Sequence, residues 1–165
     1  MEALRLFKYS RISTFIVLNK IDKVLWDVQP EGYPNTIRWN AGHVYITAED
    51  FLHDADCNYT VTKPEWLKLF IDGTSPMDWR NKEVPSSEEI MLALKEQEER
   101  INIHFQDKLK QQASIARDVN GMLLETVDSS VQFVTWHEGI HLGFMNGLNK
   151  LFQSDSSIQE LVRSR

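Results

Sequence analysis

The chain has 165 residues, of which 42% are hydrophobic and 25% are charged, and these values are typical of a compact globular protein. A formal net charge of -6 leaves no basic surface to neutralise phosphates, so nucleic acid is excluded as the main partner and anionic membrane surfaces are disfavoured. A chain of this length can bury a core as one unit, and we expect a single domain over residues 1–165.

The N-terminal region has no apolar run longer than residues 15–18, which is far short of a signal sequence or a membrane span. We therefore expect a cytoplasmic protein without a membrane partner. Cys57 is the only cysteine, which excludes an internal disulfide and a cysteine-based zinc site.

The first third of the chain contains two helical patterns separated by a turn. Apolar residues at three- and four-residue steps predict a first helix over residues 4–26. The segment 29–34, which contains two prolines and a glycine, ends it. Asn35 or Thr36 can then cap a second helix that runs to about Leu52.

The next segment, residues 53–85, loses the helical pattern and contains three prolines. A short helix over residues 65–70 is the only element predicted there. So long a connector favours a crossover between two helices that are not antiparallel neighbours. Ser86 and Glu89 then form a capping-box signature for a third helix that continues to Leu109.

Residues 121–127 are expected to be a short extended or irregular stretch, and a fourth helix is predicted from near Ser129 to about Phe152. Residues 153–165 form a polar tail. Four helices without a sheet predict an all-α four-helix bundle with a long crossover between its second and third helices.

The predicted fourth helix carries His137 and His141 near the centre of its apolar face. One buried imidazole is usually satisfied by hydrogen bonds, but two on adjacent turns require two buried polar groups to be paired at once. A spacing of four residues brings both rings over one point, and neutral imidazole nitrogens are ligands of Zn, Ni, Co and Fe. The pattern favours a divalent-metal site over two structural histidines.

A third ligand has to come from another helix, and His43, His53 and His104 are the candidates. His43 is preferred because it lies one turn into the second helix, on a flank that also carries Trp39 and Ile46. His53 lies at a helix end beside acidic residues, where a solvated side chain is expected. His104 borders the apolar stripe of the third helix and is interpreted as a surface histidine.

Residues 137–141 match the H-E-x-x-H motif of zincin metalloproteases, in which the glutamate is the general base. The match predicts an alternative, a metallohydrolase that uses Glu138. Against it, Phe144 and Gly147 occupy the positions at which the longer motif has glycine and histidine, and zincins resemble a mixed fold with a sheet. Glu138 also projects about 80° away from the two histidines, which favours a role facing solvent or capping a helix that starts at Thr135.

A wider resemblance covers nearly the whole chain. The segment Asn35-Thr-Ile-Arg-Trp-Asn-Ala-Gly-His43, a long crossover, a third helix and His137-x-x-x-His141 together resemble the DinB superfamily. The resemblance implies a four-helix bundle with an up-down-down-up course, and a metal held by His43, His137 and His141. It also implies a small-molecule substrate and a low-molecular-weight thiol, because members of the superfamily include thiol-dependent S-transferases and isomerases.

The resemblance leaves the reaction open, because fold does not determine function. Three neutral histidines leave a divalent ion with its full charge and at least one open position, as in catalytic sites. We therefore expect a metal-dependent enzyme, such as a thiol S-transferase that uses Zn, Ni, Fe or Co. A zincin-type metallohydrolase and a non-catalytic metal-binding stress or assembly module are the alternatives.

Gly139, Gly143 and Gly147 recur every four residues and form a narrow groove along the predicted fourth helix. Each glycine costs a helix about 0.8–1 kcal/mol relative to alanine, which indicates close approach by another segment. The favoured hypothesis is tight packing against another helix of the same chain. The alternative is a homodimer, which the DinB resemblance also implies.

Overall fold

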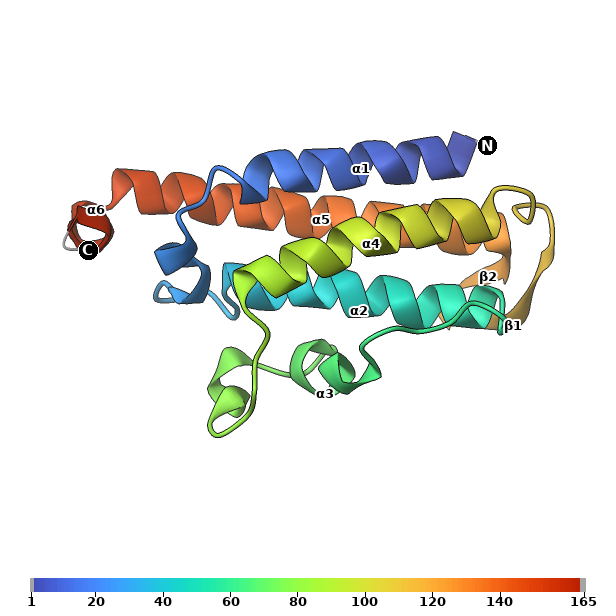
Figure 1. The fold of residues 1–165 in the computed structure, drawn as a ribbon, viewed down its shortest axis with the longest axis horizontal. Helices are drawn as coiled ribbons and strands as arrows, with labels where there is room; N and C mark the ends of the chain where they lie inside the picture. The colour runs from blue at the N-terminus through green and yellow to red at the C-terminus, as the bar shows by residue number, and fades with distance from the viewer. Residues whose placement is uncertain (1, 164–165) are drawn as a thin grey trace.

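Four long helices make up most of the chain and lie side by side along the molecule (Figure 1). The computed structural model describes residues 2–163. The long helices are α1 (Glu2–Leu18), α2 (Ile37–Ala55), α4 (Ser87–Phe105) and α5 (Val127–Ser154). α1 and α5 run in one direction, and α2 and α4 run in the other. The prediction of a mainly helical chain is confirmed.

Side-chain caps begin the second and third of these helices. The Thr36 side chain accepts a hydrogen bond from the backbone N–H of Trp39, so Thr36 rather than Asn35 caps α2. Ser86 and Glu89 form the predicted capping box at the start of α4.

The start of α5 differs from the prediction. Thr126 is its N-cap and forms a capping box with Ser129, so α5 begins at Val127, two residues earlier than expected. Ser129, the predicted start, lies inside the first turn.

The first predicted helix is wrong over its last eight residues. α1 ends at Leu18, and a separate 3-10 helix, η1 (Lys23–Asp27), follows. The Asp22 side chain accepts a hydrogen bond from the N–H of Val24, and this local bond competes with continuation of the α-helix. The apolar periodicity nevertheless persists, because the 3-10 turn directs Trp26 into the core.

The long connector forms three short helical pieces that lie along α2 on the side away from α1 (Figure 1). They are η2 (Pro64–Trp66), α3 (Leu67–Phe70) and η3 (Pro76–Trp79). Trp66 and Phe70 are buried in the core, so this crossover is packed rather than free. The predicted short helix over 65–70 is present as the continuous pair η2 and α3.

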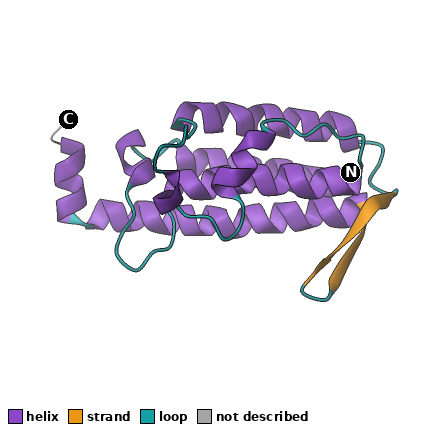
Figure 2. Ribbon diagram, turned by 90° about the horizontal axis from the view of Figure 1, so that it is seen from below, coloured by secondary structure: helices purple, strands orange, loops and turns teal. Residues whose placement is uncertain are grey.

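A β-hairpin corrects the all-α prediction. Strands β1 (Gln112–Val119) and β2 (Met122–Thr126) pair antiparallel and project from one end of the helices (Figure 2). Asn120 and Gly121 between them have φ angles of 53° and 85°, the left-handed conformation of a two-residue hairpin turn. The stretch 121–127, predicted to be extended or irregular, is mostly strand.

The third predicted helix also ends early, since α4 stops at Phe105. The Leu109 side chain is still part of the core. The carbonyl oxygen of Leu109 accepts a hydrogen bond from the backbone N–H of Asp128, with 3.0 Å between nitrogen and oxygen. At the other end of the chain, α6 (Ser156–Arg163) occupies most of the segment expected to be a polar tail.

Two apolar clusters fill the space between the helices. A layer of buried polar side chains lies where the two clusters meet. The first cluster includes Trp26, Tyr45, Phe70, Leu94 and Phe152, and the second includes Phe7, Leu52, Phe105, Leu124 and Val131. Four buried polar side chains, one from each long helix, lie near the boundary between the two clusters: Arg11, Glu49, Gln97 and Glu138. We call these four residues the polar layer. They are joined by hydrogen bonds from Arg11 to Glu138 and Gln97, and from Gln97 to Glu49.

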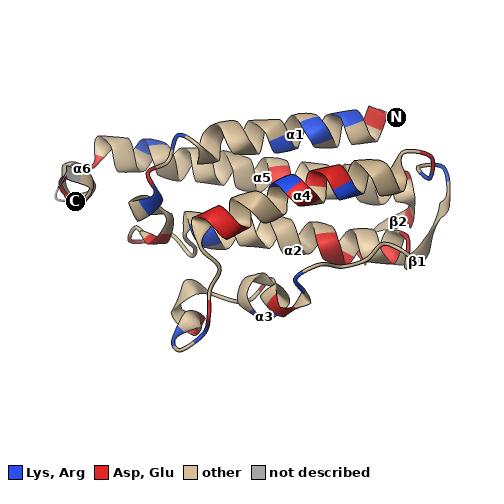
Figure 3. Cartoon of the chain, in the orientation of Figure 1, with Lys and Arg blue, Asp and Glu red and all other residues tan. Residues whose placement is uncertain are grey.

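Charged side chains of both signs are spread along the helices and connectors, but α5 carries few (Figure 3). Its acidic and basic residues are Asp128, Glu138 and Lys150. Part of its uncharged surface is open, because Trp136 and Ile140 are 60% and 49% exposed. Among residues 2–163, no helix combines the length and apolar character needed to cross a membrane.

Candidate metal centre

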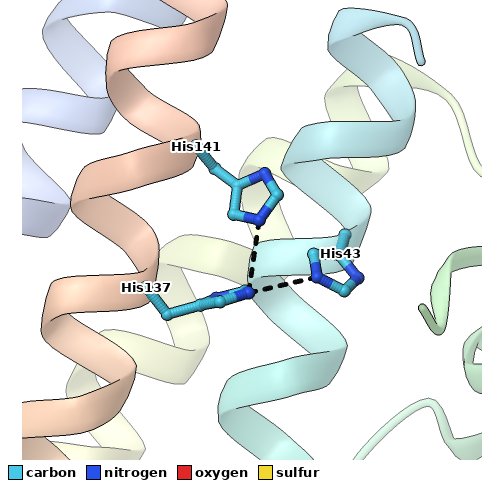
Figure 4. A group of neighbouring side chains, drawn as sticks. All are labelled: His43, His137 and His141. Carbon is cyan, nitrogen blue, oxygen red and sulfur yellow. Dashed lines mark hydrogen bonds between the residues drawn. The ribbon is translucent and has the colours of Figure 1, made fainter. Parts of the chain in front are cut away.

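Three histidines from two helices point toward one another (Figure 4). His137 and His141 lie one turn apart on α5, and His43 faces them from α2. The Nε2 atom of His137 is 3.1 Å from Nε2 of His43 and 3.2 Å from Nε2 of His141. The structure therefore brings together the three residues that the sequence singled out, and this group could hold a metal ion.

Hydrogen bonds fix two of the three rings through their other nitrogen. Nδ1 of His43 lies 2.6 Å from the carbonyl oxygen of Phe70, which can only accept a hydrogen bond. Nδ1 of His141 lies 2.7 Å from Oδ1 of Asn40, whose Nδ2 donates to the carbonyl of Thr36. Both Nδ1 atoms therefore carry the proton, and both Nε2 atoms present a lone pair to the centre.

The three Nε2 atoms at the centre have too few protons to hydrogen-bond one another at both short contacts, and a bound cation would resolve this. A proton on Nε2 of His137 can be directed at the lone pair of His43 or of His141, but not at both with good geometry. One of the two short contacts would then join two acceptors. A divalent ion removes this conflict, and nitrogens held about 2.0–2.1 Å from a tetrahedral ion lie roughly 3.3 Å apart, close to the spacing observed.

Burial keeps the three imidazoles in the neutral form that binds metal. Desolvation, followed by the proximity of the other histidines, lowers the pKa of His137 to about 3. Desolvation likewise lowers the pKa of His141 to about 4, with His43 adding to the effect and Asp72 opposing it. The pKa of His43 is lowered by desolvation, against the opposing effects of its bond to Phe70 and of Asp72.

The local packing explains why glycine precedes His43. A Cβ atom at Gly42 would lie 2.5 Å from the ring of Phe70, closer than side-chain carbons approach. Phe70 therefore packs directly on the α2 backbone, and its carbonyl reaches His43. Trp39 stacks on the opposite side of the site, with its ring 4.6 Å from that of His43 and its indole N–H bonded to Thr74. The Trp39-x-x-Gly42-His43 element thus has a packing role at each named position.

The three histidines line a cavity of about 630 Å³ that is open to a small molecule. Its other walls are mostly apolar and come from α2, the connector and α5, with Arg117 added from β1. The polar side chains around it include Asn35, Thr47, Asp50, Asp72 and Arg117. The cavity gives the candidate metal site the access that a buried structural site lacks.

Glu138 lies outside this cavity. Its side chain is 1% exposed and forms a two-point ion pair with Arg11, at 2.9 and 3.1 Å, and it accepts the hydroxyl of Thr14 at 2.7 Å. The expectation that Glu138 faces solvent or caps a helix from Thr135 is wrong, because the turn that carries it faces α1 and the polar layer. Thr135 itself lies well inside α5.

The other two histidines have structural partners away from the cavity. Nδ1 of His53 lies 2.9 Å from the carbonyl oxygen of Tyr59, and this half-buried ring is not the solvated one expected. Nε2 of His104 lies 2.8 Å from Oδ2 of Asp56. The same oxygen also accepts a hydrogen bond from Nζ of Lys108. Neither histidine joins the group formed by His43, His137 and His141.

Several residues of the site were not identified from the sequence, among them Asn40, Phe70, Asp72 and Arg117. Asn40 lies in the same helical element as His43, three residues before it, so its proximity follows from helix spacing. The hairpin that carries Arg117 is marked by Asn120-Gly121. Phe70 has no local signal, because its contact with His43 depends on how the connector folds back.

The glycines of α5 do not pack against other segments among residues 2–163. A Cβ atom added at Gly139, Gly143 or Gly147 would meet nothing within 4 Å in the described part of the chain. The favoured hypothesis of tight packing against another helix of the same chain is therefore wrong.

Fold and site together define a mainly helical protein whose three central histidines come from two helices. A family model of the DinB superfamily matches residues 6–145, and the chain belongs to this superfamily. The resemblance seen in the sequence is confirmed. A comparison with curated proteins finds no match.

Proposed function

We propose that the chain binds one divalent metal ion through Nε2 of His43, His137 and His141. The observation that carries the proposal is the convergence of three neutral imidazoles, two of them with Nδ1 fixed by an acceptor. Zn, Ni, Fe and Co are the ions that such ligands prefer. We also infer that the four long helices form the up-down-down-up bundle of the superfamily, which the directions of the helices support.

The proposal extends to a metal-dependent enzyme that transfers the sulfur of a low-molecular-weight thiol to a small electrophile. Membership of the superfamily and the cavity beside the histidines support it. Such a transfer forms a carbon–sulfur bond, expels a leaving group and releases the thiol proton. A bound divalent ion would hold the sulfur and favour its thiolate form.

Asp72 is the residue of this chain that we propose accepts the proton. Its carboxylate lines the same cavity, and its electrostatic effect reaches His43 and His141. Among residues 2–163, it accepts a hydrogen bond only from the backbone of Gly73. Asp50, the other carboxylate of the cavity, is occupied by Arg117.

The test is formation of a fluorescent thioether from N-acetylcysteine and monochlorobimane. Metal-loaded protein should accelerate the reaction, and chelation or the His137→Ala substitution should abolish the acceleration. A protein that binds metal stoichiometrically and accelerates no such reaction would favour the alternative of a non-catalytic metal-binding module. Cleavage of casein by the metal-loaded protein would favour the metallohydrolase.

We also propose a homodimer that uses the joint surface of α1 and α5. A groove there is lined by Leu6, Tyr9, Trp136, Gly139 and Ile140, and all of these except the glycine are large apolar side chains about half or more exposed. Exposed apolar patches of this kind on soluble proteins mark interaction sites. The open glycines of α5 would let a second helix approach closely.

A further inference from the structure

The hairpin turns one charged side chain toward the candidate metal centre. In β1, the half-buried residues are Ala113, Arg117 and Val119, and the others are exposed. Arg117 lines the same cavity as the three histidines. It is the only basic side chain among the described residues of that lining.

The pairing register of the hairpin shifts just before Arg117. Gln112 pairs with Thr126, whereas Arg117 pairs with Leu124, so the register shifts between these two positions. Such bulges bend a strand and re-aim a side chain, and they are common beside functional sites. Arg117 lies on the same face of the strand as Ala113 and Val119, and the exposed Ile115 interrupts the alternation between them.

Contacts with α2 hold the guanidinium in place. Nη1 of Arg117 lies 2.5 Å from Asp50 and 3.4 Å from Asp54, and its Cζ lies 3.9 Å from the centre of the Phe51 ring. Phe51 in turn stacks on Phe133 at 4.4 Å. These contacts use one nitrogen of the guanidinium. Its Nε and Nη2 have no hydrogen-bond partner in the part of the chain that the structure describes.

The charges of the cavity favour an anion once a metal is bound. A divalent ion and Arg117 contribute three positive charges to the cavity lining, whereas Asp50 and Asp72 contribute two negative ones, and Asp54, which also contacts Arg117, lies outside the lining. The two free donors of a planar guanidinium match the two oxygens of a carboxylate. Asp50 holds Arg117 without occupying that edge.

We propose that Arg117 binds an anionic group, in the first instance a carboxylate, on the small molecule whose sulfur lies at the metal centre. The inference rests on the proposed function and names its substrate class: small thiols that carry a carboxylate. Arg117 is then a specificity-determining residue, supplied by the hairpin.

The test compares two thiols that differ only in charge, N-acetylcysteine and N-acetylcysteine amide. Their dissociation constants are measured by calorimetry on cobalt-loaded protein, with cobalt content and melting temperature recorded for every variant. The variants are Arg117→Met, which keeps an apolar stem over Phe51, and Arg117→Lys, which keeps the charge but not the fork. Arg5→Met is the control, because Arg5 lies exposed in α1 and pairs with Glu2.

Wild-type protein and Arg5→Met should bind the carboxylate thiol about tenfold or more tightly than its amide, as expected for a charge-assisted pair. Arg117→Met should bind both thiols alike, with the affinity for the amide unchanged, and Arg117→Lys should fall between. Equal binding of the two thiols by wild type, or a preference that survives in Arg117→Met, would overturn the inference and leave the proposed function intact. If Arg117→Met does not fold, an undiminished preference in Arg117→Lys overturns it. Protein that takes up no cobalt would remove the proposed function and the inference together.

Discussion

Glu138 follows His137 directly in the sequence, yet its carboxylate points away from the metal centre, toward α1, and pairs with Arg11 at 2.9 Å. Both side chains are 1% exposed. Because both carboxylate oxygens are already bonded by Arg11, and one also by Thr14, Glu138 is placed to hold α1 against α5. A general base for a metal-bound water would have to lie in the cavity with the histidines.

Replacing Glu138 with Gln should destabilise the protein without removing its metal. The substitution leaves the buried charge of Arg11 without its counter-charge, which costs about 3–5 kcal/mol when one partner of a buried pair is lost. Urea unfolding and elemental analysis of the same preparation measure both effects. The double variant Arg11→Met/Glu138→Leu is the control and should recover much of the stability. Loss of a peptidase activity in Glu138→Gln, with metal retained and stability unchanged, would instead support the metallohydrolase.

The stability of metal-free protein should fall as the pH falls from about 6.5 to 5. In the folded state the pKa values of His137 and His141 are about 3 and 4, whereas in the unfolded chain they return to about 6.5. Their contribution is therefore complete above pH 6.5 and decreases below it, because the unfolded chain takes up protons that the folded protein does not. The slope approaches about 1.4 kcal/mol per pH unit for each histidine.

Urea unfolding of chelated protein at pH 7, 6 and 5 measures this dependence. The variant His137→Asn should show a smaller slope, since one of the histidines with a lowered pKa is gone. A wild-type free energy of unfolding that stays level between pH 7 and 5 would mean that the histidines titrate normally in the folded protein.

Gly42→Ala should disturb the metal centre through packing alone. The added carbon lies 2.5 Å from the Phe70 ring, so the connector has to move and the bond from His43 to the Phe70 carbonyl is lost. Overpacking of this kind costs about 1–3 kcal/mol. We expect a lower melting temperature and weaker metal binding in competition with a chelator. Gly147→Ala is the matched control, because it adds the same atom to open space on α5 and should leave metal binding unchanged.

Gly143→Leu should convert a dimer into a monomer while metal content persists. Leucine at this position projects into open space in one chain but would collide with a second helix packed on α5. Sedimentation of wild type and variant at several concentrations measures the change. A wild-type protein that remains monomeric at the highest concentration would rule out the dimer.

The sequence predicted the parts of the fold that local signals determine. Ser86 and Glu89 marked the start of α4, and the spacing of His137 and His141 placed both rings on one side of α5. The hairpin was missed although Asn120-Gly121 is a strong turn signal, because β1 is mostly exposed and its bulge breaks the alternation expected of a strand.

Long-range contacts decided the remainder of the site. His43 could be chosen over His53 and His104 only from its flank and from the family resemblance, and no local pattern connects it with Phe70. The orientation of Glu138 depended on Arg11, a residue 127 positions away in the sequence. The sequence around Arg11 does not indicate which carboxylate pairs with this buried arginine in the folded protein.

Metal content after gentle purification tests the central claim most directly. Elemental analysis should find about one divalent ion per chain in wild type, His53→Ala and His104→Ala. It should find none above background in His43→Ala, His137→Ala and His141→Ala, each of which removes one of the three converging nitrogens. Circular dichroism would check that each variant is folded. Full metal occupancy in a folded His43→Ala protein would contradict the claim that α2 and α5 share one metal centre.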